Sequence, residues 1–244
     1  RGTLSTTSIN LPRLGIKHGI ISSDKTDEKG FFAELEEKLD LVKDQLLERY
    51  EIQCKKNTYN FPFLLEQNVW IDSEKLKDND NLKKALKHGV LNIGFSGLAE
   101  CLKALTGEHQ GESKEAQKLG IKIVEFMRKK CDEYSEKYNL NFNLVATPKE
   151  EISNKFIKMD QAIYGKLKGI TDKNRYTNSF HIPEGYRIST EDKIKIEAQY
   201  HSLTNGGHIA IVQIKNVDTK DVINVIKTMK ENGIGYGKIV NMEK

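Results

Sequence analysis

The stretch NLVATPKEEIS, Asn143–Ser153, joins the end of a strand to the start of a helix with almost no intervening loop. Asn143–Ala146 is typical of a strand end. Thr147, Pro148 and Glu150 form a capping box, in which a hydroxyl caps the helix, proline takes the first helical position and glutamate follows three residues after the cap. This junction predicts an α/β sheet in which strands run directly into helices.

The same junction is a candidate site for an anion. Ligands bind at the carboxyl ends of parallel strands in such sheets, and the free N–H groups and the dipole of a helix start favour negative charge. Lys149 adds a positive charge, whereas the carboxylate of Glu150 can occupy one of the donors. Most capping boxes only start helices, so the local sequence leaves a phosphate role open.

The same alternation of strand and helix extends over the chain. Stretches that favour strands alternate with stretches whose apolar residues recur every three or four positions, as in amphipathic helices. This order predicts an α/β protein with mostly parallel strands and outer helices. The β-rich or apolar stretches are Thr3–Ile16, Phe61–Leu65, Val90–Leu98, Phe142–Pro148, Arg175–Pro183 and Gly206–Ile214. The expected helices are Phe31–Tyr50, Leu98–Leu105, Lys114–Tyr138, Pro148–Phe156, Glu191–Tyr200 and Lys220–Asn232.

The bulk composition argues against several classes of protein. The 244 residues suit one large domain or two small ones. A net charge of +4, from 39 basic and 35 acidic residues, is too small an excess to predict nucleic-acid binding. No apolar run approaches the ~18 residues of a membrane span, and no signal-peptide pattern is present. Cys54, Cys101 and Cys131 form neither a metal pair nor a disulfide framework, so we expect a cytoplasmic protein.

Two polar stretches are further candidates for a binding site. Asn10 follows an apolar residue in a strand pattern and needs partners if it is buried; it either bonds the backbone of a strand-end turn or holds a substrate hydroxyl. In Tyr176–Pro183, strand alternation places Thr177, Ser179 and His181 on one face, where they line a cavity or face water. The six histidines show no metal-binding spacing, and the acidic residues form no convincing pair. The residues alone therefore predict a fold and a candidate anion site, but no reaction.

Five stretches, in their order and spacing, resemble the catalytic subunits of anaerobic (class III) ribonucleoside-triphosphate reductases. They are RGTLSTTSINLPRLGI (Arg1–Ile16), GVLNIGFSGLAECLKALTGEHQ (Gly89–Gln110), FNLVATPKEEIS (Phe142–Ser153), YTNSFHIP (Tyr176–Pro183) and GGHIAIV (Gly206–Val212). The resemblance implies the ten-stranded α/β barrel of glycyl radical enzymes, built from two five-stranded parallel halves. This chain would hold the second half-barrel.

The resemblance also implies an activity and its partners. Such enzymes reduce ribonucleoside triphosphates to 2′-deoxyribonucleoside triphosphates, the precursors of DNA. A partner activase of the radical-SAM class makes a glycyl radical, which converts a cysteine to a thiyl radical; formate, or a thiol system, supplies the electrons. We expect a homodimer when the protein is complete, with the remainder of the reductase chain as a further partner.

Individual residues acquire roles through the same resemblance. Asn10 corresponds to a catalytic asparagine near the ribose, where it hydrogen-bonds a ribose hydroxyl or the reductant. The turn formed by Ala146, Thr147, Pro148, Lys149 and Glu150 corresponds to the place that receives the substrate phosphates. Lys149 and Glu151 depart from the small residues usual in the family. Ser179 and His181 correspond to a strand inside the barrel and are weaker candidates for substrate binding.

The parts expected to carry the radical and the metal are not found in this sequence. We expect 1–244 to be a partial catalytic barrel domain, with the thiyl-cysteine loop upstream of RGTL and the zinc cysteines and glycyl-radical segment downstream. The glycyl radical and zinc are therefore expected only in the full-length protein. Two alternatives stay open: an inactive remnant or split fragment that only binds nucleotide or a partner, and a glycyl radical enzyme of the pyruvate formate-lyase type.

Overall fold

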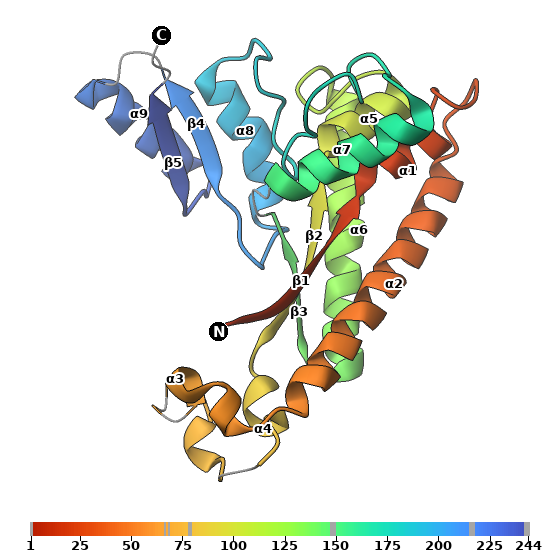
Figure 1. Ribbon diagram of the computed structural model, residues 1–244. Coiled ribbons are helices and arrows are strands. Elements are labelled where there is room, and N and C mark those ends of the chain that lie inside the picture. The colour runs from red at the N-terminus through yellow and green to blue at the C-terminus, as the bar shows by residue number, and fades with distance from the viewer. Residues whose placement is uncertain are drawn as a thin grey trace.

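The central strand of the fold is β2, Val90–Ser96 (Figure 1). It is buried along its whole length. It lies between β1 (Thr3–Asn10) and β3 (Asn141–Val145) in a three-stranded parallel sheet. A strand that is buried at every position is typical of a sheet covered on both faces. The predicted parallel α/β arrangement is thus confirmed for this part of the chain.

The computed structural model describes residues 2–65, 67, 69–77, 80–146, 150–214 and 218–241. The other helices and strands in these ranges follow in chain order. They are α1 (Leu11–His18), α2 (Glu28–Cys54), η1 (Thr58–Asn60), α3 (Pro62–Leu65), η2 (Ser73–Lys75), α4 (Lys83–Leu86), α5 (Leu98–Thr106), α6 (Lys114–Tyr138), α7 (Glu150–Tyr164), α8 (Thr190–His201), β4 (Ala210–Ile214), α9 (Thr219–Glu231) and β5 (Gly237–Asn241).

A second sheet, formed by β4 and β5 in parallel, is tied to the end of β3. The N–H of Gly206 donates to the carbonyl of Leu144 over 2.8 Å, and the N–H of Ala146 donates to the carbonyl of Gly207 over 2.9 Å. Gly206 has no room for a side chain, because an added Cβ would lie 2.9 Å from the carbonyl oxygen of Leu144. The two sheets together give five strands in the order β1-β2-β3 and β4-β5.

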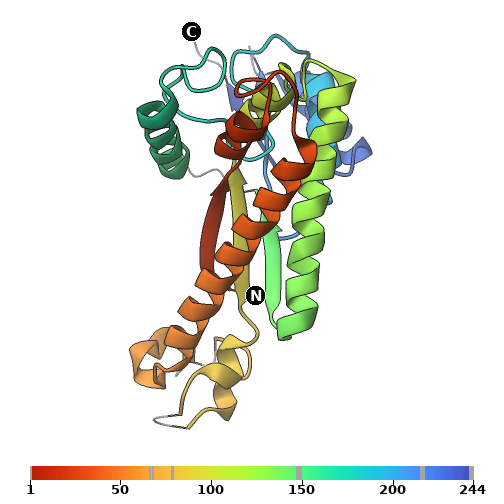
Figure 2. The same cartoon turned by 90° about the vertical axis from the view of Figure 1, so that its right-hand side faces the viewer.

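Two long helices, α2 and α6, lie side by side against one face of the three-stranded sheet (Figures 1 and 2). The stripe predicted for α2 points inward, with Leu35, Leu39 and Leu46 fully buried. Each such leucine contributes roughly 2 kcal/mol through burial of its apolar surface. Helix α6 is capped by Ser113, whose hydroxyl accepts from the N–H of Ala116 over 3.1 Å.

Most of the predicted elements are present; their ends shift by a few residues, except that α7 extends to Tyr164 and not Phe156. The confirmed strands are β2, within Val90–Leu98, and β3, which precedes the predicted phosphate turn. The confirmed helices are α2, α5, α6, α7, α8 and α9. Gly233 follows α9 with φ of 71°, the conformation that a glycine adopts readily at this position. Among the described residues, no helix has both the length and the apolar character that crossing a membrane requires.

The prediction for Thr3–Ile16 is wrong in its second half. The strand ends at Asn10, and Leu11–His18 forms α1. The side-chain oxygen of Asn10 accepts from the N–H of Arg13 over 3.4 Å, which caps the new helix, and Pro12 lies in its first turn, where a missing N–H costs nothing. The proline therefore starts a helix here rather than simply ending a strand.

Two further stretches are not the strands that the alternation suggested. Pro62–Leu65 is a single helical turn, α3. Arg175–Pro183 is irregular; its single pairing is an isolated antiparallel bridge between Asn178 and Ser96. Ser179 has φ of 45°, which breaks the alternation of side chains that a strand requires. The predicted common face of Thr177, Ser179 and His181 is therefore wrong. Conversely, β5 was not predicted.

The outer edge of β1 generates a prediction about the isolated chain. In the described part of the chain no strand pairs with this edge, although the side chains of Gln53 and Arg49 reach the carbonyls of Leu4 and Thr6 over 3.2 Å and 3.5 Å. Unpaired edge groups are a template for pairing with another chain. We expect the isolated chain to self-associate in size-exclusion chromatography with light scattering; a monodisperse monomer at high concentration would contradict the half-barrel.

Candidate functional site

Three strands end side by side, and polar residues mark two of these ends. In the parallel register Asn10, at the end of β1, lies opposite Ser96, at the end of β2, and Ala146 directly follows β3. Because the strands are parallel, their carboxyl ends share one edge of the sheet, where ligands bind in α/β proteins. Helix α7 is fastened to this edge, and the hydroxyls of Ser153 and Ser96 lie 2.7 Å apart.

Asn10 serves both the backbone and a side-chain network. Its Oδ1 accepts from the N–H of Arg13, as the structural alternative predicted. Its Nδ2 donates to Oδ2 of Asp160, on α7, over 2.7 Å. The side chain is only partly buried, and within the described residues one amide hydrogen and one lone pair remain for a further partner. Contact with a substrate stays a prediction.

Asp160 is fully buried and accepts hydrogen bonds from three segments of the chain. Besides Asn10, the Nε of Arg13 donates to Oδ1 over 2.6 Å and the hydroxyl of Tyr176 donates to Oδ2 over 2.8 Å. Burial, together with the charge of Asp160, raises the pKa of Tyr176, so the phenol stays protonated and is a donor. A buried carboxylate needs such partners, because an unpaired charge in the interior is strongly destabilising.

A second buried carboxylate, Glu100 in the first turn of α5, holds the irregular segment that follows α7. It accepts from the N–H of Thr177 over 3.2 Å, from the hydroxyl of Thr177 over 2.7 Å and from the Nζ of Lys173 over 3.0 Å. The hydroxyl of Thr177 is therefore already engaged inside the protein.

A third buried carboxylate, Glu197 on α8, holds the next part of the segment. It accepts from the N–H of Ile182 over 2.9 Å and pairs with the Nζ of Lys193 over 2.9 Å, and its Oε2 lies 3.2 Å from Nδ1 of His181. Burial raises the pKa of Glu197, but His181, Lys193 and the Ile182 N–H outweigh burial and lower it to about 2.

The predicted residue Ser179 is also buried, and its hydroxyl has no partner among the described residues.

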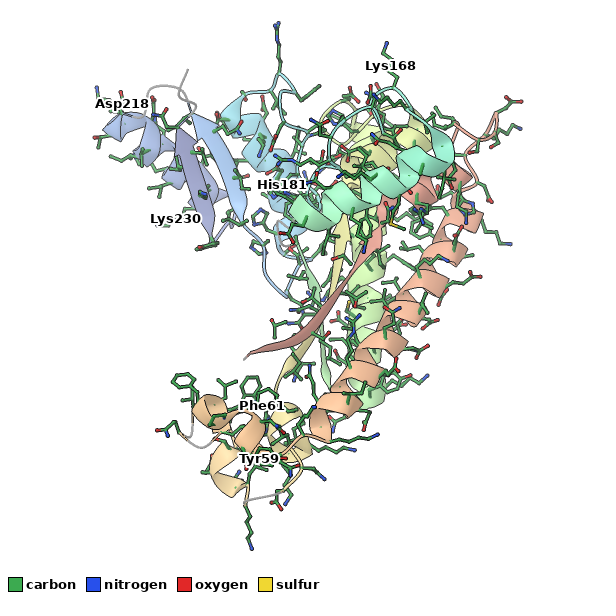
Figure 3. The ribbon with its side chains drawn as sticks, viewed as in Figure 1. Tyr59, Phe61, Lys168, His181, Asp218 and Lys230 are labelled. Atoms are coloured by element: carbon green, nitrogen blue, oxygen red, sulfur yellow. The ribbon has the colours of Figure 1, made fainter. Side chains whose placement is uncertain are left out.

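The segment held by these carboxylates forms one wall of a hollow of about 1160 Å³. His181 lies at this hollow, near the start of α7 (Figure 3). Among the described residues, four cationic side chains and the carboxylate of Glu184 line it; the cations are Lys173, Arg175, Arg187 and Lys193. Lys173, Arg175 and Lys193 pair with carboxylates, so in the described part of the chain Arg187 is the cation left for an anionic ligand. Tyr176 connects the hollow to the strand ends, because it lines the hollow and also donates to Asp160.

The predicted phosphate turn is described only at its two ends. The N–H of Ala146 already donates to the carbonyl of Gly207. The carboxylate of Glu150 pairs with Arg175 over 2.8 Å, and Arg175 also pairs with Glu184 over 2.8 Å, so the turn and the hollow are joined by this arginine. Thr147, Pro148 and Lys149 lie outside the described residues.

The described residues contain no group of three or more histidine, cysteine or acidic side chains that could hold a metal ion. The three cysteines do not fit the expected radical cysteine either. All three are buried in the hydrophobic core, so none is accessible to a substrate. None of the three lies at the strand ends that carry Asn10 and Ser96.

The predictions from the sequence did not include the three buried carboxylates, Glu100, Asp160 and Glu197. A signal was present, since Ser153, Ile157 and Asp160 recur at helical spacing and are all buried. An acidic residue on the inward stripe of a helix needs a partner. The sequence does not say which partner, because Asn10 and Asp160 are 150 positions apart.

Comparison with known proteins gives the family. The family model described as anaerobic ribonucleoside-triphosphate reductase matches residues 1–242. The anaerobic ribonucleoside-triphosphate reductase of Salmonella typhimurium (strain LT2) is 32% identical over 220 residues, which are 89% of this chain and 30% of that protein. That of Enterobacteria phage T4 is 29% identical over 219 residues, covering 89% of this chain and 34% of that protein. The chain belongs to this family and spans about a third of the length of these relatives.

Solved structures agree with the fold. The anaerobic ribonucleotide reductase from Thermotoga maritima in complex with dATP and CTP has a TM-score of 0.73 and 18% identity, over 98% of this chain and 36% of that chain. The same enzyme with glycerol in the active site has a TM-score of 0.72 and 18% identity, over the same shares of both chains. The predicted fold, that of part of the α/β barrel of these enzymes, is confirmed.

The carboxylate of Glu197 generates a prediction about pH. Its pKa is about 2 in the folded chain against 4.5 ordinarily, so its stabilising contribution is present above pH 4.5 and is lost as the pH falls toward 2. Between pH 5 and pH 3 the free energy of unfolding should fall by about 2 kcal/mol more in the wild type than in Glu197→Gln. Urea unfolding at low protein concentration measures this difference.

The matched control is Glu191→Gln, which removes an exposed carboxylate from the same helix. It should keep the pH dependence of the wild type. Equal pH dependence in the wild type and in Glu197→Gln would contradict the assignment.

Proposed function

We propose that this member of the anaerobic ribonucleoside-triphosphate reductase family forms part of a catalytic barrel that reduces ribonucleoside triphosphates to 2′-deoxyribonucleoside triphosphates. The observation that carries the proposal is the family match over residues 1–242, with Asn10 at the strand end where a substrate would lie. The complete reductase would supply DNA precursors, and this chain would supply part of its substrate pocket.

The charge of the site supports a triphosphate substrate. In the described part of the chain, Arg187 lines the hollow without an ion pair, and Arg175 joins the hollow to Glu150 at the start of α7. We place the phosphates between this hollow and the turn of Ala146, Thr147, Pro148, Lys149 and Glu150. His181 lines the hollow and would border the phosphates, whereas Ser179 is buried, and its contact with the substrate stays a prediction. The nucleotide complex of the Thermotoga enzyme supports this choice of ligand.

The role proposed for Asn10 is to hold a ribose hydroxyl, or the reductant, in a fixed place. One hydrogen and one lone pair of the amide have no partner in the part of the chain that the structure describes, so the amide can donate to and accept from a hydroxyl group. A hydrogen bond of this kind orients the hydroxyl and stabilises charge that develops on its oxygen as a bond to it breaks. Formate is the reductant that we propose.

The radical itself needs groups other than those described. The glycyl radical and its partner cysteine would supply hydrogen-atom abstraction, and the buried cysteines of this chain do not fit that role. We therefore propose that these groups, and the zinc site, belong to the complete reductase, together with a radical-SAM activase and a second reductase subunit. The family match favours a ribonucleotide reductase over the alternative of a glycyl radical enzyme of the pyruvate formate-lyase type.

The catalytic assignment is tested by Asn10→Ala in the complete, anaerobically activated reductase. We expect the rate of deoxyribonucleotide formation to fall about 100-fold or more, because a donor aimed at the reacting oxygen is lost. Binding of the nucleoside triphosphate should change much less. The matched control is Asn224→Ala, an exposed asparagine on α9, which should leave the rate unchanged.

Two outcomes would contradict the proposal in different ways. A normal rate in Asn10→Ala would remove Asn10 from the reaction. Nucleotide binding without any reduction, in the wild type as well, would leave a protein that only binds.

The phosphate assignment is tested by Lys149→Ala. Loss of this charge should weaken binding of a nucleoside triphosphate by about fivefold, the effect of roughly 1 kcal/mol, and should not alter binding of the nucleoside. Lys168→Ala removes the same charge from an exposed site that does not line the hollow (Figure 3) and serves as the control. Isothermal titration calorimetry gives the dissociation constants of the nucleoside triphosphate and of the nucleoside. Equal triphosphate affinity in the wild type and in Lys149→Ala would exclude a contact between Lys149 and the phosphates.

A further inference from the structure

We infer that Asp160 is a positioning residue for Asn10, because its buried carboxylate fixes the orientation of the Asn10 amide. The inference rests on the proposed function, which places that amide at the substrate. Asp160 does not itself reach the substrate, since it is a fully buried residue of α7.

The contacts of Asp160 converge from three segments. Oδ2 accepts from Nδ2 of Asn10 over 2.7 Å and from the hydroxyl of Tyr176 over 2.8 Å. Oδ1 accepts from Nε of Arg13 over 2.6 Å. The carboxylate thus joins the end of β1, the first turn of α1 and the wall of the hollow.

These contacts allow only one orientation of the Asn10 amide. Nδ2 must face the carboxylate of Asp160, and Oδ1 must face the N–H of Arg13. Turning the amide over would set Oδ1 against the carboxylate and Nδ2 against the N–H, so both contacts would become repulsive. The hydrogen bond to the carboxylate is the shorter and, being charge-assisted, the stronger of the two. Asp160 therefore decides which amide atoms remain for a ligand.

A role in stability alone does not account for this arrangement. Helix α7 is already fastened to the end of β2 by the contact between Ser153 and Ser96, over 2.7 Å. The network around Asp160 also leaves Nη2 of Arg13 buried without a partner in the described part of the chain, which is unfavourable for stability. Buried ion pairs are frequently no more stabilising than apolar residues of similar size. The orientation of Asn10 is what the carboxylate adds.

The test is a double-mutant cycle on turnover in the complete reductase. Asp160→Asn keeps the shape of the side chain but places an amide where a carboxylate accepted three hydrogen bonds. We expect kcat to fall about 30-fold, since a small misplacement of a reacting group has effects of this order, and KM to change less than about threefold. In an Asn10→Ala background the same substitution should lower kcat by less than about twofold, because it acts through Asn10.

A crystal structure of the Asp160→Asn reductase gives a readout that does not depend on activity. The Asn10 amide should leave its position or lose its contact with the N–H of Arg13. An unmoved amide, or a kcat of Asp160→Asn within about threefold of the wild type, overturns the inference, as does a full effect of Asp160→Asn in the Asn10→Ala background.

If Asp160→Asn does not fold, Tyr176→Phe decides the question. It keeps the carboxylate and its pair with Arg13 but removes one of the two donors on the oxygen that binds Asn10. We expect kcat to fall about threefold or more with KM almost unchanged; an unchanged kcat overturns the inference.

The outcome can be told apart from a failure of the proposed function. If Asn10→Ala is fully active, the proposed function has failed. If Asn10→Ala is inactive and Asp160→Asn is active, only the inference has failed. Asp40→Asn is the control, because Asp40 also accepts a tyrosine hydroxyl, from Tyr134 over 3.0 Å, but between α2 and α6, away from the strand ends. It should leave kcat unchanged.

Discussion

The parallel register of three strands is the constraint on which the site depends. β2 is buried throughout, and β1 and β3 pair with it on its two sides. Because all three strands run parallel, their carboxyl ends lie at the same edge of the sheet. Asn10 and Ser96 are brought together by this register alone, although they are far apart in the chain. The helices α2 and α6 then cover one face and leave the strand ends to be covered by α7 (Figures 1 and 2).

Burial of charge organises what lies beyond the strand ends. Glu100, Asp160 and Glu197 are almost inaccessible to solvent, and each comes from a different helix. A carboxylate in such a position must collect donors, because the alternative is an unpaired interior charge. The donors come from the end of β1, from Lys193 and from the irregular segment between α7 and α8. The shape of that segment follows from these contacts.

Local signals in the sequence were enough to predict the regular part of the fold. Ser113 caps α6, and an apolar stripe marks α2, because both effects act within one or two helical turns. The start of α1 carries a similar local signal, an asparagine cap followed by Pro12, but the β-rich residues before it led to a strand prediction. That error was one of interpretation and not of missing information.

The candidate site was less predictable, because its contacts join distant parts of the chain. The residues themselves made Asn10 a candidate, and its backbone contact was among the alternatives that they suggested. The family resemblance added the role at the ribose. Its carboxylate partner could not be found, since nothing local connects Asn10 with Asp160. The conformation around Ser179 depends on Glu100 and Glu197, so strand alternation failed there for the same reason.

The segment held by these carboxylates has a consequence for ligand affinity. Ordering a flexible loop around a ligand usually costs conformational entropy at the moment of binding. Here Thr177 and Ile182 are already fixed by hydrogen bonds to buried acids before any ligand arrives. The conformational entropy of this wall is lost during folding and not during binding. A nucleotide entering the hollow would therefore meet a rigid surface, and more of its interaction energy would contribute to the binding affinity.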